Sequence, residues 1–387
     1  MSGVDVVVIG GGIAGVSAAA GLSERYNVVL VELEKALAHH TTGRSAALFL
    51  ENIGTPLIRG MTLASRSYLA PPPEGLAEAP LLESRALLCI GDDTQQNEVR
   101  AMASDGARLV PSVRLIDTTE ALELCPALVE HRVASAVYEP DSMSVDVMAL
   151  HQSFVRAMRA NGGVIERDTG VTGLRWTEGA WDITTTQGTL RAPVVVNAAG
   201  AWADEVATMA GVRPVGIMPL RRTAFTSRPS QFDGGWPLVT SIDRDFYCKP
   251  EAGGYLLCSP MDETPCEPCD ASAEELDVAM AIDAVNSALD VSIRSVHTAW
   301  AGLRSFVEDR SLVLGFDDEL PGFFWCVGQG GYGIQTSPAA GATVAALVHG
   351  EDLPEQVQAH GVTPDQLSPA RLKNRTMAYG LVPPNDY

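Results

Sequence analysis

The chain of 387 residues is long enough for two domains, and 46% hydrophobic content with 36 glycines suits a compact α/β enzyme and excludes a disordered chain. Its 48 acidic residues outnumber its 27 basic residues, and the net charge of −21 excludes nucleic acid and anionic membrane surfaces as expected partners. The seven scattered cysteines are unlike a secreted disulfide framework, so we expect a reducing, cytoplasmic location.

A CxxC pair and an apolar N-terminal stretch bear on metal binding and on membrane insertion. Cys266 and Cys269 form a CxxC pair, but no second CxxC or HxxxH accompanies it, so no metal is expected. The apolar stretch 6–22 has no Lys or Arg ahead of it, carries a glycine cluster, and reaches Glu24 and Arg25 too early to span a bilayer. We therefore expect no transmembrane segment.

The first predicted elements form a βαβ unit. A continuous β-branched run predicts a strand over 6–9 that is buried on both faces, and small residues predict a helix over 13–26. A second buried strand is expected over 28–31. Such a unit implies a parallel sheet.

The same pattern returns further along the chain. Strands are expected over 193–197 and 323–327, and a helix over 336–348 follows the second of them. The alternating segment 174–189 turns at Glu-Gly and Gln-Gly and predicts a β-meander attached to this sheet. The domain formed in this way is predicted to comprise residues 1–79, 141–216 and 301–387.

The remaining segments lack the alternation of a buried strand with a helix. Mixed short strands, such as 221–226 and 246–249, indicate a second domain with an antiparallel sheet. We expect it to comprise residues 80–140 and 217–300. The predicted fold class is therefore α/β, with a discontinuous Rossmann-like domain and an inserted antiparallel-sheet domain for the substrate.

The first glycine turn, "GGGIAG", predicts a dinucleotide site. Gly10 allows the tight turn, Gly12 the close approach of a pyrophosphate, and Gly15 the packing of helix on strand. The following helix N-terminus offers N–H groups to the phosphates, and Glu32 stands where a carboxylate binds ribose hydroxyls. The acid disfavours NADP but does not separate NAD from FAD.

A second glycine turn, "GQGGYG" at 328–333, favours FAD. An N-terminal βαβ unit holds only the ADP half of FAD, so the flavin ring must meet segments far away in the sequence. "NAAGAW" at 197–202 and this second turn both follow buried strands, and a helix N-terminus stabilises the negative N1–C2=O end of a flavin that has accepted a hydride.

These residues carry a resemblance. "VVVIGGGIAG", "VELEK", "HHTTGRSAALF", "VVNAAGAWAD", "WAGLRSF" and "GFFWCVGQGGYGIQTSPAAG" are similar to the D-amino-acid oxidase superfamily of flavoproteins, and most closely to its bacterial D-arginine dehydrogenase branch. The resemblance implies non-covalent FAD and a sheet-rich substrate domain over the flavin ring. It also implies oxidation of a D-amino acid to an imino acid, which water hydrolyses to a 2-oxo acid and ammonia.

The same resemblance implies the residues that bind FAD. Thr42, Arg44 and Ser45 are expected at the flavin, with "TGRSAA" supplying backbone N–H groups, and Val171 on the adenine side. The full expected set is Gly10, Gly12, Ile13, Ala14, Gly15, Glu32, Leu33, Thr42, Arg44, Ser45, Ala46, Ala47, Val171, Ala199, Gly200, Trp202, Gly302, Gly330, Gly331, Tyr332, Gly333, Ile334 and Gln335.

Two arginines are candidates for binding a substrate carboxylate, because a planar guanidinium offers it two parallel hydrogen bonds. Arg222 and Arg304 match the carboxylate-binding arginines of the family, and Tyr247 matches the phenol that assists them. Neighbouring Arg221 points to the other face of its strand and fits a surface ion pair.

The side-chain pocket departs from the D-arginine branch. Leu87 replaces an acid, while Leu48 and Ile53 replace a histidine and a tyrosine, and Gly331 is also expected in this pocket. Aliphatic groups there favour apolar or neutral side chains, because a buried guanidinium without a partner loses several kcal/mol. Glu51 and Asn52 nearby keep a cationic side chain open as an alternative.

Three alternatives to a D-amino-acid dehydrogenase remain. An enzyme for N-methyl amino acids needs the same cofactor and carboxylate clamp. A 2-hydroxy-acid dehydrogenase needs a base, yet His39 and His40 precede the TGRS motif and His297 is expected to be buried near Trp300. A non-catalytic flavin-binding protein does not explain the arginine pair. The expected electron acceptor is a quinone or dye, with oxygen as the alternative.

Overall fold

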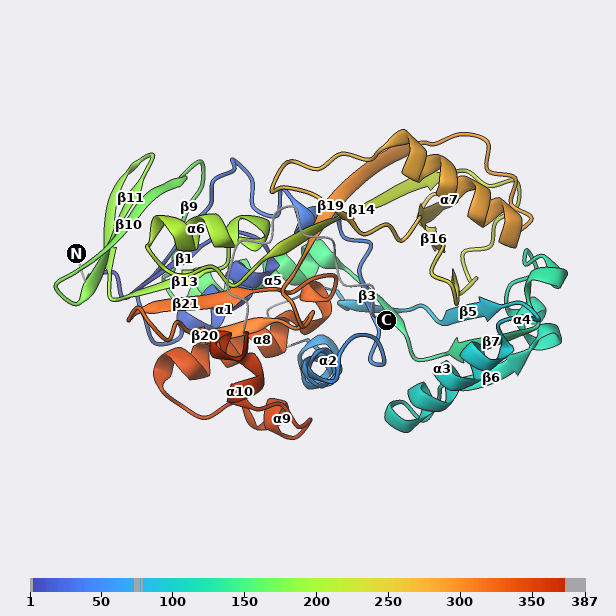
Figure 1. The fold of residues 1–387 in the computed structure, drawn as a ribbon, viewed down its shortest axis with the longest axis horizontal. Coiled ribbons are helices and arrows are strands. Elements are labelled where there is room, and N and C mark those ends of the chain that lie inside the picture. Colours follow the sequence, from blue (N-terminus) through green and yellow to red (C-terminus); the bar gives the residue numbers. More distant parts are fainter. Residues whose placement is uncertain (1–2, 73–76, 78, 373–387) are drawn as a thin grey trace.

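A computed structural model describes residues 3–72, 77 and 79–372. Two sheet systems follow one another along the long axis of the molecule (Figure 1). Residues 1–2, 73–76, 78 and 373–387 lie outside this described part, and so do the outer ends, 1 and 387, of the first expected domain. The first system is a six-stranded sheet in the order β20-β21-β13-β1-β2-β9. Its strands are β1 (Val6–Ile9), β2 (Val28–Val31), β9 (Val164–Glu166), β13 (Val194–Asn197), β20 (Val313–Phe316) and β21 (Phe323–Val327).

The βαβ prediction is confirmed by the register of these strands. β1 pairs in parallel with β2 and with β13, and β13 pairs in parallel with β21, while β20 is antiparallel to β21. Val6 and Val8 face a core formed with helices, whereas Val7 and Ile9 face a second core. Both faces are covered, which explains why β1 is apolar at every position.

Helices cover one face of this sheet and a small sheet covers the other. On the first face lie α1 (Ile13–Leu22), α2 (Pro56–Leu69), α5 (Val147–Ala160) and α8 (Gly333–His349). On the second face lie α6 (Ala203–Met209) and the meander β10 (Val171–Thr177), β11 (Ala180–Thr185) and β12 (Gly188–Ala192). The expected meander is therefore confirmed.

Two helix boundaries differ from expectation. α1 ends at Leu22 rather than at residue 26, because Ser23 closes it with its N–H on Ala19 O and its hydroxyl on Ala20 O. α8 begins at Gly333, directly after the second glycine turn, and ends before Gly350 in the left-handed conformation (φ 75°).

The second system is a nine-stranded sheet in the order β18-β14-β17-β16-β15-β5-β7-β6, with β19 also paired to β14. Its strands are β5 (Leu87–Gly91), β6 (Arg114–Asp117), β7 (Ser135–Glu139), β14 (Met218–Ser227), β15 (Leu238–Ser241), β16 (Tyr247–Glu251), β17 (Tyr255–Ser259), β18 (Thr264–Pro265) and β19 (Thr298–Phe306). Strands from both predicted inserts thus share one sheet. The expected antiparallel sheet is confirmed, with one parallel pair, β15 and β5, where the two inserts join.

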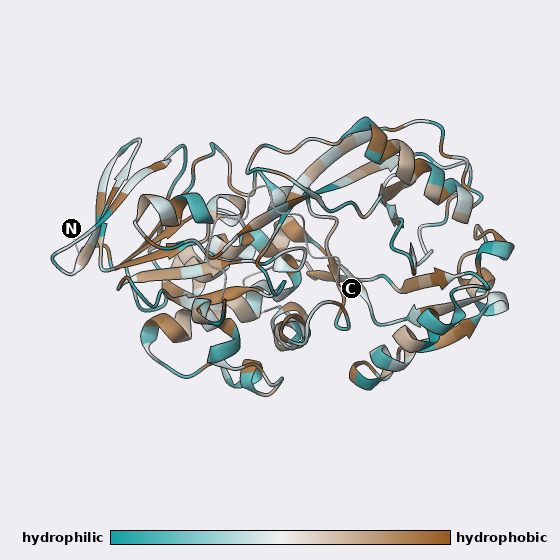
Figure 2. Ribbon diagram, in the orientation of Figure 1, coloured by the Kyte–Doolittle hydropathy of each residue, from teal (hydrophilic) through white to brown (hydrophobic). Residues whose placement is uncertain are grey.

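The outer helices of this half are amphipathic. α7 (Glu275–Ala288) packs Val278, Ala281 and Val285 on the sheet, and α3 (Gln96–Leu109) packs Val99 and Ala103. Figure 2 shows both helices as a mixture of polar and apolar residues, as expected for helices with one exposed face. The remaining elements are α4 (Thr118–Leu124), α9 (Glu355–Gln358), α10 (Pro364–Leu367) and a small sheet of β3 (Leu48–Phe49), β8 (Met143–Val145) and β4 (Leu82–Ser84).

Candidate active site

A cavity of about 1700 Å³ is bordered by residues of both sheet systems. It begins at the first glycine turn and reaches β5, β14, β16 and β19 of the large sheet. Every residue expected at the cofactor or the substrate borders it except Gly15. The cavity therefore unites segments that lie more than 300 positions apart in the sequence.

The first glycine turn has the geometry that its sequence predicts. Gly10 has φ +113°, and a Cβ there would lie 2.5 Å from Ala198 O. A Cβ on Gly15 would lie 1.8 Å from Gly10 O, so Gly15 lies behind the turn and allows α1 to pack closely. Thr42 Oγ1 accepts a hydrogen bond from Ile13 N at 3.0 Å and fixes the helix start beside the cavity.

Glu32 ends β2 at the cavity wall. One of its oxygens accepts a hydrogen bond from Gly11 N at 2.5 Å, and the other accepts one from Glu34 N at 2.8 Å. These bonds fix the carboxylate at the glycine turn, where a ribose bound to the same turn presents its hydroxyls.

Arg44 makes contacts that its expected role does not include. Its guanidinium donates to Ala271 O at 2.7 Å and to Ala301 O at 2.9 Å, and it also pairs with Asp270. The side chain therefore connects its loop to the large sheet, and Arg44 also borders the cavity, so its role at the flavin stays a prediction. Thr41 Oγ1 donates to Leu303 O at 2.8 Å and strengthens the same connection.

The second glycine turn makes room for Arg304. A Cβ on Gly331 would lie 2.8 Å from Arg304 Cζ, and a Cβ on Gly330 would lie 2.2 Å from the Phe306 ring. Gln335, in the first turns of α8, exchanges hydrogen bonds of 3.2 Å with the backbone of Leu50. The turn thus joins the start of α8 to both Arg304 and the chain near β3.

Arg222 and Arg304 come from paired strands, β14 and β19, and both border the cavity. Arg222 is only 9% exposed; its Nε donates to Asp262 O at 2.7 Å and its Nη2 to Glu263 at 3.2 Å. Its Nη1 is buried without a hydrogen-bond partner among the described residues. Burial, and secondly the charge of Arg304, lower the pKa of Arg222 to about 10. Within the described part of the chain, Arg222 therefore has a free donor, Nη1, beside the second positive charge of Arg304, and an anionic ligand can bind there.

Arg221 occupies the opposite face, as expected. It pairs with Glu274 and with Asp277, the latter at 3.0 Å, and does not border the cavity.

The other wall of the substrate region is apolar. Leu48, Ile53 and Leu87 border the cavity together with Leu238, and Tyr247 packs against the same cluster. Glu51, the alternative partner for a cationic substrate, is bound by Arg66 through both its oxygens at 2.6 and 2.9 Å and is not part of the cavity lining. Asn52 does border the cavity, and its Nδ2 donates to Glu139 at 2.8 Å.

The histidines separate into two places. His39 and His40 border the cavity near Glu34, and these three form the group of potential metal ligands found among the described residues. His40 Nε2 lies 3.1 Å from Glu34 Oε1, so a hydrogen bond accounts for that contact. His297 is exposed and stacks on Tyr255, which corrects the expectation of a buried residue near Trp300.

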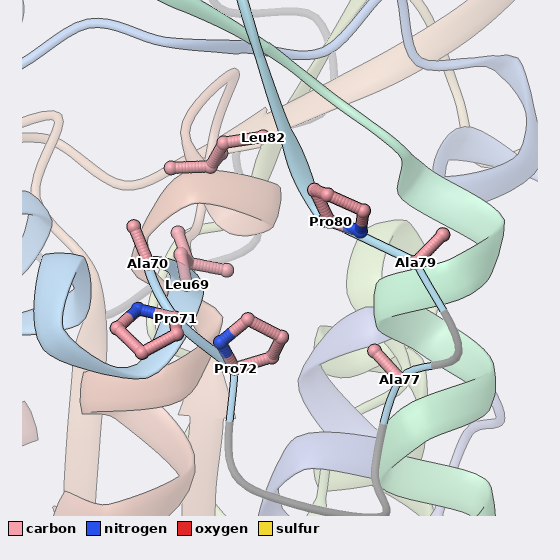
Figure 3. A pocket seen from close by; sticks show the side chains of 8 residues that line it. All are labelled: Leu69, Ala70, Pro71, Pro72, Ala77, Ala79, Pro80 and Leu82. Carbon is pink, nitrogen blue, oxygen red and sulfur yellow. The ribbon is translucent and has the colours of Figure 1, made fainter.

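A second, smaller hollow of about 360 Å³ lies beyond the end of α2. Among the described residues, its lining consists of aliphatic and proline side chains without an ionisable group (Figure 3). Its lining is Leu69, Ala70, Pro71, Pro72, Ala77, Ala79, Pro80 and Leu82.

The glycine cradle, the fixed Glu32 and a cavity long enough to continue to the second glycine turn together fit FAD. A model of the DAO family, described as FAD dependent oxidoreductase, matches residues 5–347. The chain belongs to this family. The superfamily resemblance and FAD as cofactor are thereby confirmed.

This FAD-dependent oxidoreductase is similar to several curated proteins. It is 29% identical over 269 residues to hydrogen cyanide synthase subunit HcnC of Pseudomonas aeruginosa, covering 68% of this chain and 63% of that protein. It is 29% identical over 147 residues to human mitochondrial dimethylglycine dehydrogenase, covering 37% of this chain and 17% of that protein. The chain thus spans less than two thirds of these two relatives.

Glycine oxidase of Geobacillus kaustophilus is similar over a larger share. Its sequence is 25% identical over 357 residues, covering 89% of this chain and 92% of that protein. Its crystal structure superposes with a TM-score of 0.81 at 23% identity, covering 90% and 95% of the two chains. The fold of this oxidoreductase is therefore that of glycine oxidase.

Two charged residues of the oxidoreductase were missed by the sequence analysis. Glu263 and Arg310 both border the cavity beside Arg222 and Arg304. Neither lies in a glycine turn or a regular strand, so no motif or periodicity indicates them. Among the described helices, none is long and apolar enough to cross a membrane.

Proposed function

We propose that the protein oxidises the Cα–N bond of D-amino acids with apolar or neutral side chains. The observation that carries this proposal is the unpartnered, buried Arg222 Nη1 beside Arg304 at the cavity wall. Such a donor costs about 1–3 kcal/mol unless a ligand satisfies it. A substrate carboxylate does so, and it is the group common to all amino acids.

The apolar wall supports the preference for apolar or neutral side chains. Leu87 is 2% exposed and, with Leu48 and Ile53, offers no partner for a charge. Desolvating a cationic side chain against these residues is unfavourable, because Glu51 is already paired with Arg66. A methyl, isobutyl or phenyl group gains from the same burial.

When bound, FAD supplies a two-electron acceptor for the hydride that leaves Cα. Arg222 and Arg304 hold the carboxylate, and Tyr247 assists them from β16. With that end fixed, the configuration at Cα decides whether hydrogen or side chain points toward the acceptor, which is how the site distinguishes D from L. The two cations and the apolar wall favour the neutral amine, whose lone pair is needed for hydride loss. Water then hydrolyses the imino acid to a 2-oxo acid and ammonia.

Oxidation of N-methyl amino acids is the second candidate. It is favoured by the similarity to a protein named dimethylglycine dehydrogenase and by a cavity large enough for an N-substituent. It uses the same arginine pair. A 2-hydroxy acid is a weaker candidate, because His297 is exposed and outside the described cavity wall. The two histidines that do border the cavity, His39 and His40, already have Asp270 and Glu34 as partners.

An anaerobic spectral titration tests the proposal. The FAD-loaded protein is mixed with D-alanine, D-leucine, L-leucine and sarcosine, and bleaching of the flavin absorbance is followed. D-Leucine is expected to bleach fastest, with sarcosine as the leading secondary amine. Bleaching by L-leucine alone would refute the D-configuration. Re-oxidation with quinone, dye and oxygen then identifies the acceptor, and we expect quinones or dyes to react faster than oxygen.

A further inference from the structure

Three arginines surround one protein carboxylate in the substrate cavity. Arg310 Nη2 donates to both oxygens of Glu263, at 3.0 and 2.9 Å. Arg222 Nη2 donates to one of these oxygens at 3.2 Å, and Arg304 Nη1 lies 3.9 Å from it. Glu263 is therefore bound as a small carboxylate ligand would be.

Hydrogen bonds of the preceding residue, Asp262, fix Glu263 in this position. Its neighbour Asp262 accepts hydrogen bonds from Thr223 N at 2.7 Å and Thr223 Oγ1 at 3.1 Å. The Asp262 carbonyl accepts the bond from Arg222 Nε. The loop between β17 and β18 is thus anchored to β14, and Glu263 follows directly into the cavity.

Arg310 is held equally firmly. It adopts φ +54° in the turn after β19, its N–H donates to Val307 O at 2.9 Å, and its Cζ lies 3.7 Å from the centre of the Phe306 ring. The pair with Glu263 consequently belongs to the architecture of the site and not to a mobile surface contact.

The donors of this cluster suffice for two carboxylates. Glu263 fills the position formed by Arg310 and Arg222 Nη2, while Arg222 Nη1 has no hydrogen-bond partner among the described residues and Arg304, its neighbour in the cavity wall, lies 3.9 Å from Glu263. We propose that Glu263 is an internal counter-anion that leaves room for a single substrate carboxylate, and so restricts this end of the site to monocarboxylates. This inference rests on the proposed function.

Glu263 excludes a second carboxylate in two ways: it occupies the position at Arg310, and it repels a like charge. Three guanidinium groups attract anions, and without Glu263 the Arg310 position would be open to a second carboxylate of the same substrate. With Glu263 present, a dicarboxylate meets both a filled position and a like charge. Glu263 is thus a specificity-determining residue, acting by exclusion.

Binding without turnover tests this. The FAD-loaded protein is titrated with acetate and propionate, and with malonate and succinate, and Kd is read from the change in flavin absorbance. The wild type should favour the monocarboxylates. Glu263→Gln should lower Kd of the dicarboxylates at least tenfold relative to the monocarboxylates, and Glu263→Asp should preserve exclusion. Glu98→Gln removes another cavity carboxylate and should change nothing.

A double variant tests which residue binds the second carboxylate. Glu263→Gln with Arg310→Met should lose the gained dicarboxylate affinity. The inference is overturned if Glu263→Gln weakens both ligand classes equally, if it leaves their ratio unchanged, or if the double variant keeps the gain. FAD content and Tm of each variant show that the fold is intact. A wild type that binds neither ligand class refutes the carboxylate site of the proposed function itself. A wild type that binds monocarboxylates retains that site, and the variants then decide the inference about Glu263 alone.

Discussion

Removing either carboxylate-binding arginine should lower kcat/KM for every amino-acid substrate by a similar factor. Arg304 contacts protein carboxylates only at 3.9 Å, so Arg304→Met mainly removes the interaction with the ligand. A hydrogen bond to a charged group contributes about 1.5–3 kcal/mol, which corresponds to a decrease of about 10- to 150-fold. Arg222→Met should cost more, because it also leaves Asp262 O without its donor.

The neighbouring Arg221 provides the matched control. Arg221→Met removes an arginine from the same strand, but its partners Glu274 and Asp277 lie on the other face. We expect its kcat/KM to stay within about twofold of the wild type, since Arg221 does not border the cavity and cannot contact a bound substrate. The assay is steady-state turnover with an artificial acceptor on glycine, D-alanine and D-leucine. Full activity of Arg304→Met, or an equal loss in Arg221→Met, refutes the carboxylate clamp.

Three further predictions concern the cofactor and stability. Glu32→Ala should weaken FAD retention by about 1.5–3 kcal/mol, measured by fluorescence of released FAD, because charge-assisted bonds to the ribose are lost; unchanged retention removes Glu32 from the site. Acid precipitation should release all of the flavin, and colour left on the precipitate would contradict non-covalent binding. Burial raises the pKa of Glu139, so the folded state binds its proton more tightly than the unfolded state and loses stability as pH rises through the folded pKa. The free energy of unfolding of Glu139→Gln, relative to that of the wild type, should therefore increase from acid to neutral pH. Denaturant titrations measure both values, and a difference between them that does not change with pH refutes this.

The parallel sheet and its glycine turn were predictable because local sequence decides them. Val6 to Ile9 must be apolar at all four positions when helices and the meander cover both faces. Gly10 and Gly15 must lack Cβ atoms, since each Cβ would overlap a backbone oxygen. Such requirements can be recognised in the local sequence, without knowing which distant segments pack against it.

The charged part of the site was only partly predictable, because long-range pairing decides which side chains meet. Arg44 and Glu51 are single residues whose partners, Asp270 and Arg66, cannot be inferred from spacing. The Glu263–Arg310 pair joins two loops that come together only through the pairing of β14 with β18 and β19. The parallel contact of β5 with β15 likewise depends on two segments separated by about 150 residues.

Leu87 gives the sharpest test of the side-chain pocket, because its neighbour in the sheet modifies the expected result. Leu87 lies directly opposite Glu139, which is 2% exposed and bound by Asn52. Cross-strand Cβ atoms lie about 4.5–5.5 Å apart, so Leu87→Glu places two carboxylates together and favours a cation between them. We expect the ratio of kcat/KM for D-arginine over D-leucine to rise by about 10- to 150-fold, as a new charged hydrogen bond of about 1.5–3 kcal/mol forms. Leu87→Gln has the same shape without the charge and should raise the ratio much less, while glycine, which has no side chain, should be little changed in both variants. A ratio equal in Leu87→Glu and Leu87→Gln means that Leu87 does not face the substrate side chain, and the preference for apolar substrates then has to come from Leu48 and Ile53 instead.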